Sequence, residues 1–223
     1  MNNDEQLKYD GNVILIPALL VFIIWFIYWI EIKFGFNFNK YGVYPRDLIG
    51  FRGIFLTHFI HSNTNHLFNN SVPLFVLTGS LIYFYKDVAY KVLIFGALLT
   101  GLATWLIARE SYHIGASGVV YALFSFVFFS GIIKKHYRLV ALSLSIIFLY
   151  GSMIWYILPI KDGMSWEGHL SGFLVGLGFS IVYRKKGITK KEYEFSKTDF
   201  DTFFDEEGNL IQNNTDELNE DSK

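Results

Sequence analysis

Six apolar blocks separated by short charged clusters constrain this chain of 223 residues more than any other feature. Each block is close to the roughly 20 residues that a helix needs to cross about 30 Å of hydrocarbon at about 1.5 Å per residue. A helix satisfies its own backbone hydrogen bonds in lipid, whereas a barrel would show alternating segments of about ten residues. The sequence therefore predicts an all-α, polytopic bundle of six transmembrane helices, at about 13–32, 65–85, 90–108, 116–133, 139–158 and 167–184.

The composition is typical of a membrane protein and excludes several functions. Hydrophobic residues make up 52% of the chain and charged residues 17%, which is more apolar surface than a soluble domain of this size can bury. The chain has no cysteine, which excludes disulfides and thiolate metal or redox sites, and it has no basic patch for nucleic acid. The first block is too long for the core of a signal peptide and no small-x-small cleavage site follows it, so we expect a retained span.

Basic residues in short loops predict the orientation of the bundle. Clusters at 134–138 and 184–186 belong on the cytoplasmic side, and an even number of spans then puts both termini there. We expect a cytoplasmic N-terminus over 1–12, a membrane domain over 13–185, and an acidic, largely disordered cytoplasmic tail over 186–223. The expected location is the inner (plasma) membrane of a bacterium.

The segment from about 33 to 64 is too long for a turn between spans and too aromatic for a disordered linker. Its phenylalanine and tyrosine residues are interrupted by charges, a mixture that suits a structure lying in the membrane interface. Four cations of this loop, which is outside in the assigned orientation, oppose that orientation: Lys33, Lys40, Arg46 and Arg52.

Ser117 lies between Gly115-Ala116 and Gly118, at the start of the fourth apolar block. Serine in a membrane helix often bonds the carbonyl four residues back and is then only structural. The flanking glycines and a candidate base elsewhere favour a nucleophile instead. Hydrolysis needs water, so such an enzyme has to keep a wet cavity around the serine and bring the base from another helix.

The candidate base is His169, at the outer end of the sixth block and at a depth similar to that of Ser117. Its unperturbed pKa of about 6.5 suits proton transfer from a hydroxyl near neutral pH. Two stripes of small residues, which allow helices to approach closely in a membrane, would bring the two residues together. Tyr121, one turn below Ser117, could pack its ring on the imidazole and orient it. The stripes consist of Gly118, Ala122 and Ser125 on the fourth block and of Gly172 and Gly176 beside His169 on the sixth.

His66 and Asn70 are four residues apart in the second block, so on a helix both side chains point to one face. An imidazole and a carboxamide are donors of the kind that stabilise an oxyanion, and the backbone N–H of Ser117 could point the same way. The alternative is that the two side chains only connect neighbouring helices. Gly115 could be a simple helix-start residue or could let a substrate backbone approach the serine.

These residues carry a resemblance: the chain resembles the rhomboid intramembrane serine proteases over roughly residues 13 to 185. The motifs are the runs 66–70 (HLFNN), 115–121 (GASGVVY) and 168–172 (GHLSG) with Gly176. The resemblance implies a dyad of Ser117 and His169, an oxyanion site, and proteolysis of transmembrane helices near their outer ends. It also implies that the fifth helix and the loop before the histidine gate the substrate, a single-pass or multi-pass membrane protein, and that no cofactor is needed. The tryptophan-arginine pair of many members is not clear here, and Phe51-Arg52 is the nearest candidate.

The sequence also contains features that suggest other functions. His58 and His61, with His66, could suggest a metal site, but there is no His-Glu-x-x-His run and no carboxylate in this stretch, so packing and loop hydrogen bonds are expected for both. For the acids near the base, Asp162 and Glu167, we expect exposure in a loop. A non-catalytic binder or chaperone of membrane helices with the same fold is the alternative function. A transporter would show polar or broken helices in corresponding positions of two halves, which this chain does not.

Overall fold

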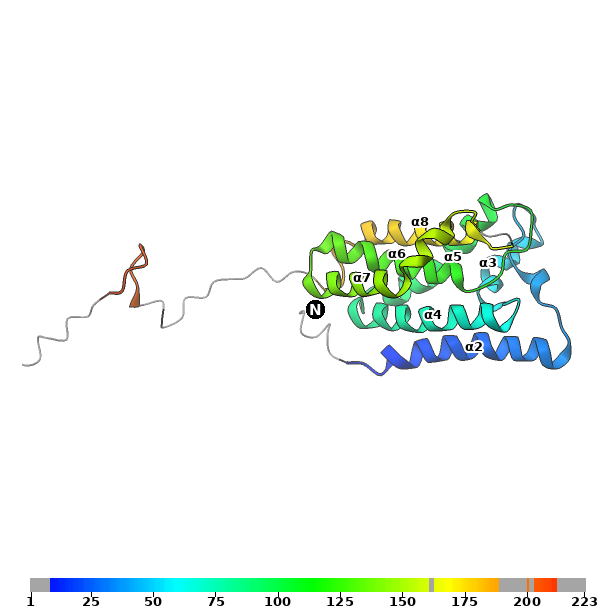
Figure 1. Ribbon diagram of the computed structural model, residues 1–223, viewed down its shortest axis with the longest axis horizontal. Coiled ribbons are helices and arrows are strands. Elements are labelled where there is room, and N and C mark those ends of the chain that lie inside the picture. The colour runs from blue at the N-terminus through cyan, green and yellow to red at the C-terminus, as the bar shows by residue number, and fades with distance from the viewer. Residues whose placement is uncertain (1–8, 161–162, 189–199, 201–202, 212–223) are drawn as a thin grey trace, which may run out of the picture. The chain divides into compact units, whose positions relative to one another are not determined.

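The computed structural model describes residues 9–160, 163–188, 200 and 203–211 (Figure 1). The chain divides into two compact units, residues 1–190 and 191–223, each of which is described by itself. Asp162 lies outside the described residues, so its expected exposure has no structural counterpart.

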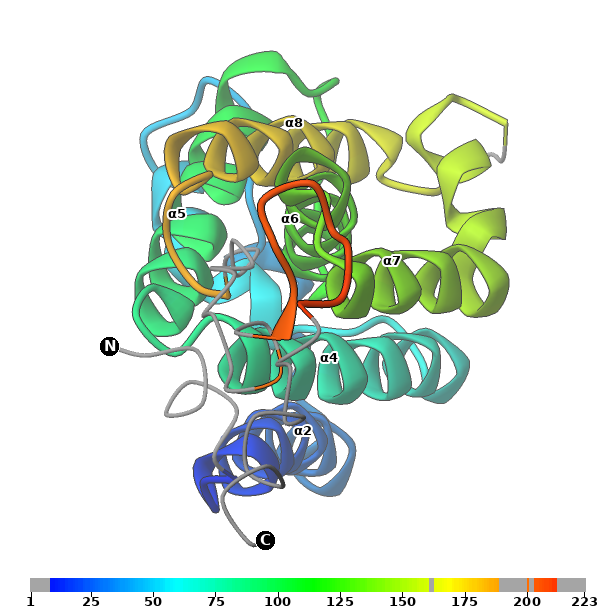
Figure 2. The same cartoon turned by 90° about the vertical axis from the view of Figure 1, so that its left-hand side faces the viewer.

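Helices make up the regular structure of the first unit, and the predicted all-helical fold is confirmed. The long helices run side by side along the length of the bundle (Figures 1 and 2). Among the described residues, β-pairing is limited to isolated bridges. The α-helices are α2 (Asn12–Phe34), α3 (Gly53–Leu56), α4 (Thr64–Phe84), α5 (Ala89–Ile107), α6 (Ser117–Lys134), α7 (Tyr137–Tyr150) and α8 (Trp166–Val182), and the 3-10 helices are η1 (Asn39–Tyr41), η2 (Gly50–Arg52), η3 (Thr57–Phe59) and η4 (Gly151–Ile157).

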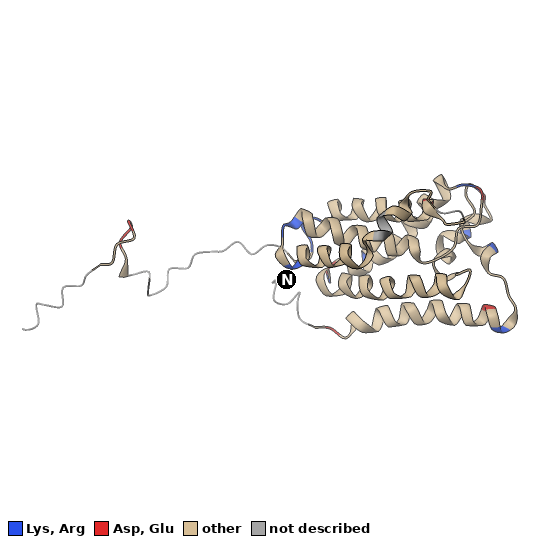
Figure 3. Ribbon diagram, viewed as in Figure 1, with Lys and Arg blue, Asp and Glu red and all other residues tan. Residues whose placement is uncertain are grey.

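Four of the helices in the described part of the chain are long and apolar enough to cross a membrane: α2, α4, α5 and α6. The apolar runs of the sequence produce them because a helix leaves no backbone group unsatisfied in lipid. Charged residues of the first unit gather at the two ends of the bundle and leave the middle of these helices almost free of them (Figure 3). This distribution is that of an integral membrane protein.

The fifth apolar block differs from the prediction of one continuous helix over 139–158. The α-helix α7 ends at Tyr150, and the chain continues through η4, Gly151–Ile157, as a 3-10 helix. Hydropathy records how apolar a stretch is but not which hydrogen bonds its backbone makes. Here a carbonyl of η4 bonds a side chain of α8, as described below.

Helix α6 lies at the centre of the bundle, with α4, α5, α7 and α8 around it (Figure 2). Most of its residues are buried, including Phe124 and Phe126, whereas only Pro17 and Ile24 of α2 are buried. Helix α2 lies at the periphery and contacts α4. The central position of α6 means that its first residue, Ser117, can be approached from several helices.

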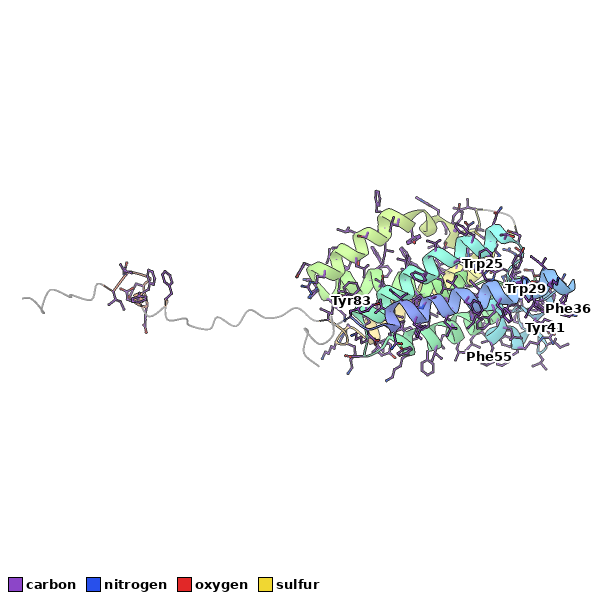
Figure 4. All side chains as sticks on the ribbon, turned by 90° about the horizontal axis from the view of Figure 1, so that it is seen from below. Trp25, Trp29, Phe36, Tyr41, Phe55 and Tyr83 are labelled. Atoms are coloured by element: carbon purple, nitrogen blue, oxygen red, sulfur yellow. The ribbon has the colours of Figure 1, made fainter. Side chains whose placement is uncertain are left out.

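The chain between α2 and α4 is folded against the ends of the other helices and contains η1, η2, α3 and η3. Val43 pairs with His113 of the loop between α5 and α6, and Arg46 donates to the Ala108 carbonyl at the end of α5 over 2.8 Å. Figure 4 shows Phe36 and Tyr41 of this segment beyond Trp29 of α2, at the end of the bundle opposite Tyr83. An aromatic cluster at one end is typical of a segment in the membrane interface.

The described part of the second unit is a short turn. The carboxylate of Asp205 accepts the backbone N–H of Asn209 at 2.7 Å, and Phe204 forms a bridge with Leu210. The predicted disorder of the tail concerns residues that lie mostly outside the described ones, so it stays a prediction.

Candidate active site

Ser117 is the first residue of α6 and follows a loop, Ala108–Ala116, that leaves α5. The backbone of Gly115 has φ +116°, a conformation that is strained for any residue with a Cβ. A methyl group on Gly115 would also lie 2.7 Å from Nε2 of His66. Gly115 is therefore required both by the turn that presents the serine and by the close approach of the neighbouring imidazole.

The structure brings Ser117 and His169 together. Nε2 of His169, in the first turn of α8, lies 3.0 Å from Oγ of Ser117, and its Nδ1 lies 2.9 Å from the carbonyl oxygen of Tyr156 in η4. A carbonyl can only accept, so Nδ1 carries the proton of the neutral imidazole and Nε2 is left to accept from the hydroxyl. The ring of Tyr121 stacks on the imidazole, with centroids 4.3 Å apart and planes 12° from parallel.

The absence of a side chain at two glycines of α8 allows this contact. A methyl group on Gly172 would overlap the carbonyl oxygen of Gly118, and one on Gly176 would overlap that of Ala122. Ser125 extends the same seam, because its hydroxyl donates to the carbonyl of Phe173 over 2.7 Å. The two stripes of small residues predicted from the sequence thus face each other along α6 and α8.

His66 and Asn70 lie on one face of α4, both directed at Gly115: a methyl group there would lie 3.6 Å from Nδ2 of Asn70. Asn70 uses one amide hydrogen on the carbonyl of His66 at 3.1 Å, which leaves its second hydrogen for another acceptor. Nδ1 of His66 lies 3.3 Å from the hydroxyl of Ser62, and in the tautomer in which Nδ1 accepts from that hydroxyl, Nε2 carries the proton and can donate. An imidazole and a carboxamide therefore converge beside the start of α6.

The sequence model of the Rhomboid domain matches residues 50–186, more than half of the chain. The chain belongs to the rhomboid family. Uncharacterized proteins of Mycobacterium bovis and of Mycobacterium tuberculosis are each 30% identical over 154 residues, which cover 64% of this chain and 63% of the relative. An uncharacterized protein of Mycobacterium leprae is 31% identical over 140 residues, covering 56% and 53%. The chain thus spans less than two thirds of the length of the curated relatives that it matches.

A small polar cavity lies beside the serine of this rhomboid. Its volume of about 20 Å³ exceeds the roughly 10–15 Å³ that one water molecule needs. Hydroxyl and imidazole groups from the first loop, α5 and the two loops that lead to Ser117 and His169 surround it, so a water there would find several partners. Its lining includes Thr57, Thr100, Thr104, His113, Ser117 and Ser165.

Two polar pairs beside the site were not found from the sequence, and the expected exposure of Glu167 is wrong. Glu167 is buried, and both of its carboxylate oxygens accept from Nη1 of Arg109, at 3.1 and 3.3 Å. Nδ1 of His113 lies 2.6 Å from the hydroxyl of Ser165. All four residues are within eight positions of Ser117 or His169, and this proximity was the available signal. Their partners lie more than 50 residues away, so the sequence could not pair them.

His58 and His61 bond the backbone in this rhomboid, as the sequence analysis expects. Nε2 of His58 lies 3.0 Å from the carbonyl of Ala97, and Nε2 of His61 accepts the N–H of Ala116 at 3.3 Å. Burial lowers the pKa of His58 to about 4 and that of His61 to about 3, so both are neutral at physiological pH. Within the described ranges, no three His, Asp or Glu side chains gather where a metal could bind.

Proposed function

We propose that this rhomboid is an intramembrane serine endopeptidase in which Ser117 is the nucleophile and His169 the general base. The observation that carries the proposal is the 3.0 Å contact between Nε2 of His169 and Oγ of Ser117, with Nδ1 bound to the Tyr156 carbonyl. That contact lies within the 2.6–3.2 Å reach of a general base. The backbone carbonyl acts in place of the aspartate of a triad, because it holds the tautomer that leaves Nε2 free.

The reaction proceeds by acyl transfer. His169 takes the hydroxyl proton as Oγ of Ser117 attacks a substrate carbonyl, and it then returns that proton to the leaving amine. The oxyanion accepts hydrogen bonds from Nε2 of His66, the amide of Asn70 and the N–H of Ser117, each worth about 3–4 kcal/mol of transition-state stabilisation in hydrolases. Water from the cavity beside the serine hydrolyses the acyl-enzyme, with the same imidazole as base.

The proposed topology has six crossings. Helix α8, with 17 residues, is roughly 26 Å long, and α7 together with η4 forms the fifth crossing. Both termini are then cytoplasmic and the dyad lies near the outer face, below the interfacial first loop. Substrates are transmembrane helices of single-pass or multi-pass proteins, cut near their outer ends after passing the fifth helix and the loop before His169. The bacterial relatives support a location in a bacterial plasma membrane.

The test uses purified, full-length protein in lipid nanodiscs with a single-span reporter. We expect wild-type protein to cut the reporter and to be labelled at Ser117 by a fluorophosphonate probe. The variants S117A and H169A should lose cleavage while keeping the thermal melt of the wild type. Cleavage by purified S117A at the wild-type rate would refute the proposal.

The alternative is a non-catalytic protein that binds membrane helices. Binders of this fold need neither a nucleophile nor a base, and here the two lie at hydrogen-bond distance. A folded wild-type protein that binds the reporter without cutting it and without reacting with the probe would favour this alternative.

A further inference from the structure

The loop that delivers Ser117 and the segment that delivers His169 are joined directly by side chains. Arg109 and His113 belong to the loop Ala108–Ala116, and their partners belong to the residues 164–167, just before the histidine. Ser117 and His169 are thus held together by this connection between the two segments as well as by the packing of α6 on α8.

The first link is an ion pair with one buried partner. The carboxylate of Glu167 is 4% exposed and takes two hydrogen bonds from Nη1 of Arg109, whose side chain is 46% exposed. The Arg109 backbone N–H also points at Glu167, at 3.3 Å, and Nη2 donates to the carbonyl of Met164 over 2.6 Å. The Arg109 guanidinium therefore bonds Met164 before the start of α8 and Glu167 in its first turn. Breaking a pair of this kind costs more than breaking an exposed one, because a buried charge is left behind.

The second link redirects a capping residue. Ser165 immediately precedes α8, where a serine usually accepts an N–H of its own helix, but its hydroxyl makes no such bond. It lies instead 2.6 Å from Nδ1 of His113. Nε2 of the same imidazole lies 3.0 Å from the carbonyl of Arg109, so Nε2 carries the proton and Nδ1 accepts from the serine. Helix α8 therefore has no side-chain N-cap, and the Ser165 hydroxyl instead connects the two loops.

The loop Ala108–Ala116 is fixed on its other side by the first loop. His113 exchanges two backbone hydrogen bonds with Val43, at 2.8 and 3.0 Å, and its carbonyl also accepts from Oγ1 of Thr57 at 2.7 Å. The N–H of Gly115 donates to the Thr57 carbonyl at 2.9 Å. Hydrogen bonds to the first loop therefore fix the loop Ala108–Ala116, and the residues before His169 are bonded to it in turn.

We propose that Arg109, His113, Ser165 and Glu167 are positioning residues that set the distance between the base and the nucleophile. The inference rests on the proposed function. His169 is held by η4 on one side, through the Tyr156 carbonyl, and by this connection on the other. Because residues 164–167 lead directly into His169, the connection to the α5–α6 loop fixes the position of the imidazole relative to Ser117 in addition to the contact with η4.

The experiment measures kcat and KM of the full-length protein in nanodiscs for E167Q, with E110Q as the matched control. Glu110 belongs to the same loop and pairs with Arg46 at 4.0 Å, but its side chain is 76% exposed and this pair does not involve α8. Since a displacement of about 1 Å can cost about 100-fold in rate, we expect kcat of E167Q to fall about 10- to 100-fold with KM little changed. The E110Q variant should behave as the wild type.

A second pair of variants keeps the test independent of the folding of E167Q. S165A removes the hydroxyl and S165T retains it, so kcat should fall about 10-fold in S165A and recover in S165T. Equal kcat in wild type, E167Q and S165A would overturn the inference, as would a rise in KM at unchanged kcat. A wild-type protein that neither cuts the reporter nor reacts with the probe would overturn the proposed function and this inference together. An active wild type with unaltered variants overturns the inference alone.

Discussion

Replacing Gly172 by alanine tests the packing that brings Ser117 and His169 together. The new methyl group would overlap the carbonyl oxygen of Gly118 and lie 3.0 Å from its carbonyl carbon and 3.2 Å from the nitrogen of Ala122. Ordinary contacts begin at 3.4 Å, and backbone atoms cannot rotate away as the end of a flexible side chain could. Helix α8 therefore has to move away from α6 by about 1 Å, since carbon atoms pack best at about 3.5–4.0 Å.

This displacement changes the distance between His169 and Ser117, because His169 lies one turn before Gly172 on the same face of α8. A shift of about 1 Å would lengthen the 3.0 Å contact between Nε2 and Oγ beyond the reach of a general base. We expect kcat of G172A to fall about 100-fold. Overpacking should also cost about 1–3 kcal/mol of stability, which lowers the melting temperature.

The matched control is G178A, on the same helix. No atom lies within 4 Å of a methyl group at Gly178, so this variant should keep the wild-type kcat. Alanine is also favoured over glycine in a helix by about 0.8–1.0 kcal/mol, so G178A should melt no lower than the wild type. Both variants are assayed for reporter cleavage and thermal unfolding in the same nanodiscs. Wild-type kcat in folded G172A would refute the argument that the glycine sets the helix separation.

Three further outcomes are expected. Y121A should lower kcat up to about 10-fold, because ring stacking on His169 is worth about 0.5–1.5 kcal/mol, whereas Y121F keeps the ring and most of the rate. G115A should abolish cleavage by pushing His66 aside, and a crystal structure of the variant with an unmoved imidazole would contradict this. Burial lowers the pKa of His58 to about 4, so the unfolded state takes up the proton first as pH falls below about 6.5, and this residue alone should lower the free energy of unfolding by about 2 kcal/mol at pH 5, with a similar loss from His61. Melting between pH 7.5 and 5 checks the last outcome, and H58Q should reduce the dependence on pH by the His58 contribution.

Particular elements show why some features could be predicted from the sequence. Helix α6 begins at Ser117, where the glycine-rich run meets an apolar block, because both signals are local. The small stripes of α6 and α8 follow from spacing alone, since residues three and four apart share a helix face. His66 and Asn70 fall on one face of α4 for the same reason.

Other elements could not be predicted because their partners are remote. Burial of Glu167 depends on Arg109, 58 residues away, and no sequence pattern around either residue indicates its partner. Hydropathy is uniform over the fifth block, so it does not indicate that α7 ends at Tyr150 or that a 3-10 helix follows. The unused cap at Ser165 is visible only once His113 is seen beside it.

The sequence by itself determined that this protein is a helical membrane protein and which side chains are the candidates for its chemistry, and its three motifs resemble those of the rhomboid family. The helical membrane character follows from composition, and the shared helix faces follow from the 3.6-residue period; both act over a few turns of chain. Only the tertiary structure decided that His169 meets Ser117 at 3.0 Å, that a carbonyl of η4 holds its tautomer, and that the two loops are joined beside it. Those facts depend on the separation of the helices. Glycines, which have no Cβ atom, and contacts between residues distant in sequence set that separation.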